Sequence, residues 1–348
     1  MKIAQAAPLF VRIPPERYGG TERVVHALTE ALVARGHDVT LFAAGEARTS
    51  AELHATTPEP LWELGISDSL AYRVLQVEEI VRRSAEFDVI HSHLDYLPWL
   101  AGERLRAPLI TTMHGRLDLP DLRPLLSAMN GRPLISISDS QRRPVADLDL
   151  NWLATVHNGL ELASTYELGD GRGGHLVFLG RIAPEKDPVT AIQVAIKAGV
   201  PLKIAARVDP IDQAYFDAQV RSLVDHPLIE WIGEVDDVDK SELLGTARAL
   251  LMPVDWDEPF GLSFIEALAC GTPVISTPRG SLPEVVRQGC DGFLCPDQEA
   301  LVRACHEVCE LDRAACRAGA LERFSSERMA AGYERAYRLA AEGEVLVA

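Results

Sequence analysis

The stretch Glu258-Pro-Phe-Gly-Leu-Ser-Phe-Ile-Glu266 places two carboxylates on either side of a glycine. The pattern predicts a turn that carries Glu258, a helix that begins near Gly261, and Glu266 about one turn into that helix. The backbone N–H groups of Gly261, Leu262 and Ser263 have no partners within such a helix and lie at the positive end of its dipole. A phosphate group fits this helix start, and hydroxyl groups beside the phosphate can donate to Glu266, whose side chain leans back toward the start.

Two basic side chains precede this stretch in the sequence. Gly180, Arg181 and Lys186 lie in the predicted loop between the strand at 175–179 and the helix at 188–198. Two carboxylates would repel a diphosphate unless cations accompany them, so we expect Arg181 and Lys186 to supply that positive charge. The alternative is that both cations are solvated surface residues.

Together these residues resemble the retaining glycosyltransferases of family 4, in both the Glu-x7-Glu motif at 258–266 and the Gly-Arg-x4-Lys motif at 180–186. The resemblance covers nearly the whole chain, is strongest between His175 and Gly292, and is weakest from 47 to 85, where no family pattern is visible. It implies an α/β protein of GT-B architecture, in which two Rossmann-like domains face each other across a cleft.

The resemblance also implies roles for the motif residues. Glu258 is expected to accept hydrogen bonds from the transferred sugar, and Glu266 from the ribose of the nucleotide. Arg181 and Lys186, with the helix start, are expected to stabilise the diphosphate leaving group in place of a divalent metal. No cofactor and no metal are expected beyond the nucleotide sugar itself, which is a co-substrate.

Apolar runs and helical patterns alternate along the chain, as a parallel α/β sheet requires. We predict an N-terminal acceptor-binding domain over 1–168, a C-terminal nucleotide-sugar-binding domain over 169–325, and a C-terminal helix in 326–348 that crosses back to the first domain. The glycine-rich Gly169–Gly174 is interpreted as the connector. Predicted strands lie at 2–6, 38–43, 88–91, 109–112, 134–137, 155–158, 175–179, 202–206, 229–232, 249–252 and 273–276.

The first half offers two further site residues. Gly20 stands at the start of the first predicted helix, 19–35, where a ligand can approach the backbone closely. The family has a Gly-Gly pair at this point that contacts the donor phosphate or the acceptor, and we predict that Gly20 binds the donor. His114 ends a predicted strand at the place where the family carries a histidine against the donor sugar. The simpler interpretations are a loop cap for the glycines and, for strand-end histidines such as His91 and His93, a structural hydrogen bond.

Composition limits the function. The formal net charge of -17 argues against nucleic-acid binding, which depends on clustered Lys and Arg. No apolar run approaches the roughly 18 residues that span a bilayer, and the start lacks a signal-peptide pattern, so we expect a cytoplasmic protein without stable membrane association. The six cysteines lack a CxxC pair and are expected to be reduced thiols, not zinc ligands.

The predicted activity is transfer of a hexose from a nucleoside-diphosphate sugar, a UDP-sugar in preference to a GDP-sugar, to a hydroxyl of a small soluble acceptor, either a small molecule or a glycan. The resemblance implies that the anomeric configuration is retained. The alternatives are a nucleotide-sugar epimerase of the same fold and a non-catalytic nucleotide-sugar-binding protein. A phosphorylase of the same fold is disfavoured, because such an enzyme usually needs a longer chain. The acceptor, the donor sugar and the oligomeric state are not encoded in any pattern that we recognise.

Overall fold

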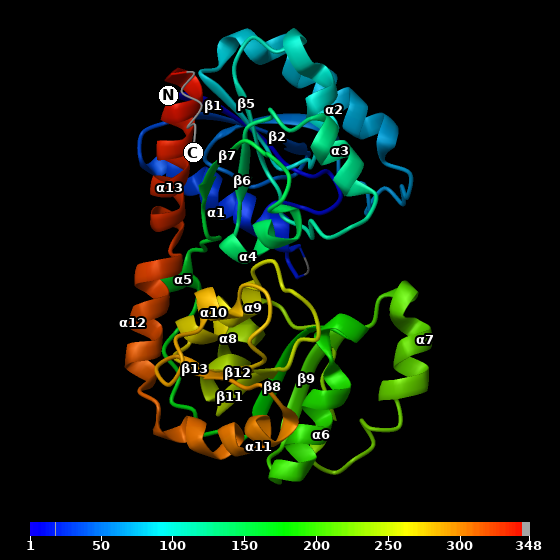
Figure 1. Ribbon diagram of the computed structural model, residues 1–348, viewed down its shortest axis with the longest axis vertical. Coiled ribbons are helices and arrows are strands. Elements are labelled where there is room, and N and C mark those ends of the chain that lie inside the picture. The colour runs from blue at the N-terminus through cyan, green and yellow to red at the C-terminus, as the bar shows by residue number, and fades with distance from the viewer. Residues whose placement is uncertain (18, 343–348) are drawn as a thin grey trace. The chain divides into compact units, whose positions relative to one another are not determined.

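The computed structural model describes residues 1–17 and 19–342, and these form two compact units (Figure 1). The first unit consists of Met1–Leu160 together with the C-terminal helix α13 (Ser326–Glu342), and the second unit is Glu161–Ser325. Tyr18 and residues 343–348, the end of the predicted C-terminal segment, lie outside the described residues.

The first unit is built on a seven-stranded sheet in which every neighbouring pair is parallel, in the order β3-β2-β1-β4-β5-β6-β7. The strand order reverses between β1 and β4, and ligands of such sheets bind beyond the carboxyl ends of the strands at that point. The strands are β1 (Lys2–Ala6), β2 (Asp38–Ala44), β3 (Glu52–Thr57), β4 (Val89–Ser92), β5 (Leu109–Thr112), β6 (Leu134–Ser136) and β7 (Trp152–Thr155). The helices are α1 (Gly20–Ala34), α2 (Leu70–Arg83), α3 (Leu122–Ala128), α4 (Asp139–Arg142) and α13.

The second unit repeats this plan with six strands in the order β10-β9-β8-β11-β12-β13, again all parallel. Its order reverses between β8 and β11. The strands are β8 (Leu176–Arg181), β9 (Leu202–Arg207), β10 (Ile229–Trp231), β11 (Ala249–Met252), β12 (Val274–Ser276) and β13 (Gly292–Leu294). The helices are α5 (Leu162–Thr165), α6 (Pro188–Ala198), α7 (Gln213–Tyr215), α8 (Asp237–Thr246), α9 (Leu262–Ala269), α10 (Leu282–Val285), α11 (Gln298–Glu307) and α12 (Arg313–Phe324).

The central strands of both sheets are buried, as in parallel sheets that helices cover on both faces. Strands β4 and β11 are buried at every position. Helices pack on both sheets through one apolar face, as α1 does with Val24, Val25 and Leu28. The result is an α/β fold of two Rossmann-like units, as the sequence predicts.

Helix α13, the last helix of residues 19–342, packs against α1, β4, β5 and β7 of the first unit. Tyr333 and Tyr337 on its inner face have no solvent exposure. The buried Glu334 accepts from Arg35 Nε (2.7 Å) and contacts His37 Nε2 (2.9 Å). The helix therefore completes the core of the unit whose first strand begins the chain.

The unit boundary differs from the predicted one. It falls between Leu160 and Glu161, and α5 packs on α8, α9 and α12 of the second unit. The glycines at 169–174, which we interpreted as the connector, lie within the second unit: Gly169 N–H donates to Cys270 O, and a Cβ on Gly169 would lie 2.0 Å from Gly245 O. Glycine is needed here because two backbones approach closely, which the composition of the segment does not distinguish from a linker.

The strands differ from prediction mainly in their ends. The strand predicted at 155–158 is β7, which ends at Thr155, three residues earlier than expected. The segment that lacked a visible pattern contains β3 and α2. Strand β3 is an edge strand that is mostly half-exposed, so it has no apolar run to reveal it.

Candidate functional site

Strand β8 delivers Arg181 to its carboxyl end, where three carboxylates surround the guanidinium. Nη2 contacts Glu185 Oε1 at 2.7 Å, and Nη1 lies 3.3 Å from Asp209 Oδ2 and 3.2 Å from Asp212 Oδ2. Burial raises the pKa of Asp212, although the charge of Arg181 opposes this. An anionic ligand at Arg181 must therefore exchange with carboxylates that already neutralise it.

The turn at Pro184–Lys186 presents Lys186, and the structure brings this cation against Glu258. The ammonium of Lys186 contacts Glu258 Oε2, to which Trp256 Nε1 also donates (3.1 Å). Glu258 is only 6% exposed, and the Lys186 ammonium lies 4.9 Å from the centre of the Trp256 ring. A buried carboxylate is costly without such partners, so Lys186, Trp256 and Glu258 form one charge-compensated cluster.

Helix α9 begins as the sequence predicts. Gly261 is its N-cap, with φ of 83°, and a Cβ there would lie 2.4 Å from the ring of Phe264. The cap has no side-chain hydrogen bond, and the first turn has no acidic residue. The first backbone N–H groups of α9, including those of Leu262 and Ser263, thus stand at a helix start without a side-chain cap, which is the environment that favours an anion.

Glu266 faces a partner that the sequence did not reveal. Its Oε1 accepts from Tyr166 Oη (2.7 Å) and from Lys240 Nζ (2.9 Å), and Lys240 also contacts Asp237 Oδ1 (2.8 Å). Glu266 and Lys240 are 5% and 7% exposed. Lys240 lies on α8 and Tyr166 follows α5, so neither has a local motif that links it to the helix of Glu266.

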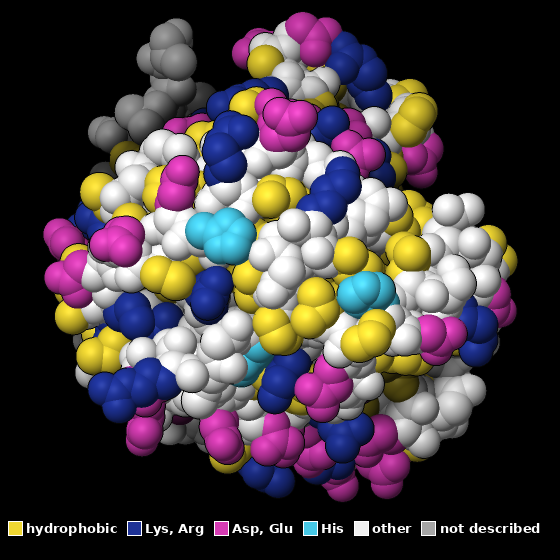
Figure 2. Space-filling model, turned by 90° about the horizontal axis from the view of Figure 1, so that it is seen from below, with side chains coloured by type: hydrophobic (Ala, Val, Ile, Leu, Met, Phe, Trp, Pro, Cys, Tyr) yellow, Lys and Arg dark blue, Asp and Glu magenta, His cyan; other side chains and the backbone are white. Residues whose placement is uncertain are grey.

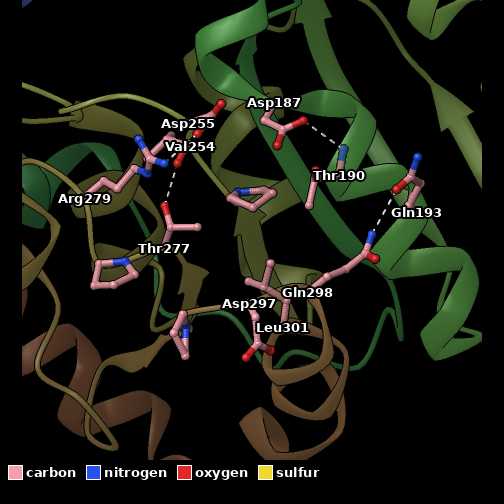
Figure 3. Close-up of a pocket in the computed structure, with 13 residues that line it drawn as sticks. Asp187, Thr190, Gln193, Val254, Asp255, Thr277, Arg279, Asp297, Gln298 and Leu301 are labelled. Carbon is pink, nitrogen blue, oxygen red and sulfur yellow. Dashed lines mark hydrogen bonds and ion pairs between the residues drawn. The ribbon is translucent and has the colours of Figure 1, made fainter.

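A pocket of about 530 Å³ in the second unit lies beside these residues, but none of the nine predicted site residues line it (Figure 3). Its charged lining is mainly acidic. Asp187 and Asp297 accept from the N–H groups of Thr190 (3.0 Å) and Ala300 (2.8 Å) and so cap α6 and α11, and Asp255 pairs with Arg279 (2.9 Å). These carboxylates disfavour a diphosphate in this pocket, and their hydrogen bonds give two of them a structural role.

In the first unit, Gly20 and His114 line one pocket of about 430 Å³. Gly20 is the first residue of α1, and His114 follows β5. His114 Nε2 lies 2.8 Å from His93 Nδ1. Desolvation lowers the pKa of His114 to about 4, so the ring is neutral at pH 7.

His91 and His93 belong to a buried polar network, in agreement with the structural role considered for them. His91 Nδ1 contacts Tyr337 Oη (2.8 Å) and its Nε2 contacts Thr112 Oγ1 (2.7 Å), while Thr112 Oγ1 lies 3.1 Å from Tyr333 Oη. The pKa of both histidines lies well below the usual value because of burial. The network joins the strands beneath the pocket to helix α13.

The described residues contain neither a metal cluster nor a membrane span. Over residues 1–17 and 19–342, no group of three or more His, Cys, Asp or Glu side chains could hold a metal ion. Within the same residues, no helix combines the length and apolarity needed to cross a membrane. Cys270, Cys295, Cys305 and Cys316 are buried free thiols, and Cys290 and Cys309 are exposed. The surface seen in Figure 2 intersperses Lys and Arg with Asp and Glu and shows no broad basic patch.

Comparison with known proteins decides the family. Residues 170–320 match the family of glycosyl transferases group 1, and residues 18–164 match glycosyltransferase family 4. The chain belongs to the family 4 glycosyltransferases. The Glu-x7-Glu and Gly-Arg-x4-Lys motifs fall within the first match, and Gly20 and His114 within the second.

Relatives are similar over most of the chain. The phosphatidyl-myo-inositol mannosyltransferase of Mycobacterium leprae is 29% identical over 333 residues, which cover 87% of this chain and 86% of that protein. The sucrose-phosphate synthase of Thermosynechococcus elongatus has the same fold, with a TM-score of 0.77, 20% identity and 99% and 100% of the two chains covered. The Anabaena protein HepE in complex with UDP-glucose has a TM-score of 0.73, 18% identity and 98% and 100% coverage. This family 4 glycosyltransferase thus has the GT-B fold.

Proposed function

We propose that this glycosyltransferase moves a hexose from a UDP-sugar to a hydroxyl of a small soluble acceptor, with retention of the anomeric configuration and without a metal. The observation that carries the proposal is the Lys186–Glu258 contact beside the open start of α9. It combines a cation for a diphosphate with a carboxylate for sugar hydroxyls. We propose UDP and not GDP as the nucleotide because the Anabaena protein of the same fold was crystallised with UDP-glucose.

The charges of the second unit support a leaving-group role. Arg181 ends β8 and Lys186 lies in the turn that follows it, and the backbone N–H groups at 261–263 add positive potential at the start of α9. Negative charge grows on the diphosphate as its bond to the sugar breaks, so these groups stabilise the transition state more than the bound donor. That is the electrostatic work that a divalent metal performs in other transferases.

Glu258 is poorly suited to be a covalent nucleophile, since Lys186 and Trp256 already bind its Oε2. We assign it to the hydroxyls of the transferred sugar. Retention then requires attack on the face that the leaving group departs from. The bond from the anomeric carbon to the phosphate oxygen breaks, the bond to the acceptor oxygen forms, and the acceptor proton passes to the departing phosphate.

Glu266 is assigned to the ribose. Its contacts with Tyr166 and Lys240 fix its carboxylate at the inner turn of α9 and compensate its charge. Ribose hydroxyls are donors, so they can join these partners on the carboxylate without adding charge.

The test begins with a thermal-shift comparison of UDP, GDP and their sugars. A ligand that binds only the folded state raises the melting temperature. We expect UDP and a UDP-hexose to give larger shifts than GDP and its sugars, and a larger shift with GDP overturns the nucleotide assignment. Mixing the best donor with candidate acceptors should yield a glycoside that retains the donor's anomeric configuration, with or without EDTA.

The same incubations distinguish the alternatives. A donor isomerised in the absence of acceptor indicates an epimerase. Binding without turnover for any acceptor indicates a nucleotide-sugar-binding protein. An inverted product contradicts the front-face mechanism while leaving the donor site intact.

A further inference from the structure

The pocket of the first unit has a lining that selects for a particular chemistry. It lies beyond the carboxyl ends of β1, β4 and β5, between the start of α1 and the loops that carry Leu94 and His114. Three of its lining residues are formally charged: Glu22, Asp95 and Arg73. Carboxylates thus outnumber cations two to one in the pocket.

Glu22 is the most unusual of these residues. Glu22 is 7% exposed. Within residues 1–17 and 19–342, its side-chain carboxylate accepts a hydrogen bond from the backbone N–H of Glu22 itself. Burial raises the pKa of this carboxyl. The side chain stands in the first turn of α1, the position at which a helix otherwise attracts a phosphate. The carboxylate of Glu22 therefore already lies where a phosphate would otherwise bind.

His114 presents the pocket with a hydrogen-bond acceptor, because a chain of buried contacts fixes its proton. Gln5 Nε2 donates to Tyr337 Oη (2.9 Å), so Gln5 Oε1 accepts from His93 Nε2 (2.8 Å). A neutral His93 that carries its proton on Nε2 must accept on Nδ1, and His114 Nε2 therefore donates to it (2.8 Å). Nδ1 of a neutral His114 is left without a proton.

The other two charged residues of the pocket, Arg73 and Asp95, lie away from its acceptor-lined inner wall. Arg73 donates from Nη2 to Leu94 O (3.4 Å), and its charge acts on Asp95. Asp95 stands at the exposed rim in a left-handed conformation, with φ of 53°. Arg73 is thus engaged at the rim, while the inner wall offers the carboxylate of Glu22 and the bare nitrogen of His114.

We propose that the pocket of the first unit binds an uncharged polyhydroxyl acceptor, a free sugar or cyclitol, and that Glu22 excludes the corresponding phosphate esters. Hydroxyl groups donate to the acceptors on the inner wall, whereas a phosphate would meet a desolvated carboxylate. The proposal rests on the proposed function only in that it calls this ligand the acceptor.

The first experiment measures specificity. Wild-type protein is assayed with glucose, myo-inositol and their monophosphates, and kcat/KM should favour each free polyol by at least about tenfold. Glu22→Gln should reduce that preference by about tenfold, chiefly through KM for the esters, because it keeps the shape and removes the charge. Glu103→Gln removes an exposed carboxylate of the same unit outside the pocket and should leave the ratio unchanged. An unchanged ratio in Glu22→Gln, or a wild-type preference for the esters, overturns the proposal.

The second experiment separates this proposal from the transferase assignment. Binding of myo-inositol and of its monophosphate is followed without any donor, by NMR of 15N-histidine-labelled protein. The free polyol should shift the His114 resonances, and the ester should do so only in Glu22→Gln. If neither polyol perturbs His114, the pocket assignment is wrong even where glycosyl transfer occurs; if binding is seen but no donor is ever consumed, the proposed function is wrong instead.

The same spectra report the proton on His114. We expect Nε2 protonated and Nδ1 bare in the wild type. Tyr337→Phe removes the hydroxyl that accepts from Gln5 and should produce mixed tautomers at His114, whereas Tyr333→Phe, one turn earlier on α13, leaves the contacts from Tyr337 to His114 intact and should not. A protonated Nδ1 in the wild type contradicts the acceptor-lined wall.

Discussion

The two units begin their key helices in opposite ways. Helix α1 follows Gly19, whose φ is 146°, and holds the carboxylate of Glu22 in its first turn. Helix α9 follows Gly261, whose φ is 83°, and has neither an acidic first turn nor a side-chain cap. Each glycine sits where a Cβ would collide, with Pro15 in the first unit and Phe264 in the second. Two similar backbone devices thus differ in charge, because α1 carries a carboxylate in its first turn and α9 carries none.

Removing the charged side chain of Glu258 or of Lys186, beside the start of α9, should have the largest effect on turnover. Glu258→Ala and Lys186→Ala should each lower turnover by at least about a hundredfold while the fold survives, because the leaving group loses its cation or the sugar loses its anchor. Steady-state kinetics with a saturating UDP-sugar measures this effect.

Two further variants test whether the pair acts as a unit. The double variant should cost little more than either single one, since the two side chains contact each other. Lys203→Ala, at a half-exposed lysine of β9, is the matched control and should retain activity. Wild-type rates in Lys186→Ala would end the diphosphate assignment.

The backbone at the start of α9 offers the next test. Gly261→Ala should lower the free energy of unfolding by about 2 kcal/mol and weaken UDP binding, because the new Cβ combines a positive φ with a contact of 2.4 Å to Phe264. Gly36→Ala is the control: Gly36 has nearly the same φ, 86°, and a Cβ there would meet nothing within 4 Å. This variant should lose only the part of the unfolding free energy that comes from the backbone conformation, and it should leave UDP affinity unchanged. Urea unfolding and calorimetry of UDP binding provide both numbers. Equal losses in the two variants would show that φ alone matters.

The C-terminal ends of α1 and α9 are each joined by an arginine contact to a helix near the C-terminus of the chain, α13 and α12 respectively. Arg317 of α12 donates to Ala269 O at the end of α9, and Arg35 after α1 pairs with Glu334 of α13. Hydrogen bonding to Arg35 lowers the pKa of Glu334 to about 2 from its usual 4.5, so the stabilisation is present above pH 4.5 and is lost as the pH falls toward 2.

Glu334→Gln should therefore lower the free energy of unfolding by about 1 kcal/mol at pH 7, a modest value because the Arg35 side chain is 37% exposed. The difference from wild type should shrink as the pH is lowered from 4.5 to 2.5. Denaturant titrations across that range measure it, and a difference that stays constant with pH would assign the effect to packing.

Glu22→Gln should have the smallest effect on stability, with the opposite sign. Burial raises the pKa of Glu22 above its usual 4.5, so folding is favoured by the protonated carboxyl at low pH and this contribution is lost as the pH rises through the raised pKa. The variant should match wild type near pH 4 and exceed it in melting temperature near pH 8. A variant that is less stable at pH 8 would mean that the carboxylate has a partner that stabilises it.

Local pattern predicted most of the fold and part of the site. A buried strand such as β11 is a short apolar run that needs no tertiary context, and the start of α9 follows from Gly261 alone. The partners of Glu266 could not be predicted, because Tyr166, just after α5, and Lys240 of α8 lie 100 and 26 residues away from it in the sequence. Two of the three carboxylates around Arg181, those of Asp209 and Asp212, likewise come from the loop after β9, which no motif connects to it.

The position of α13 has a consequence for the order in which the protein is made. Residues 1–160 leave the ribosome first, yet Tyr333 and Tyr337, which complete their core, arrive only after the whole second unit has been synthesised. The nascent first unit therefore waits with an open apolar face and an unfinished histidine network, while residues 161–325 can fold without delay. A chain released after Ser325 should display a protease-resistant C-terminal unit and a protease-sensitive N-terminal one.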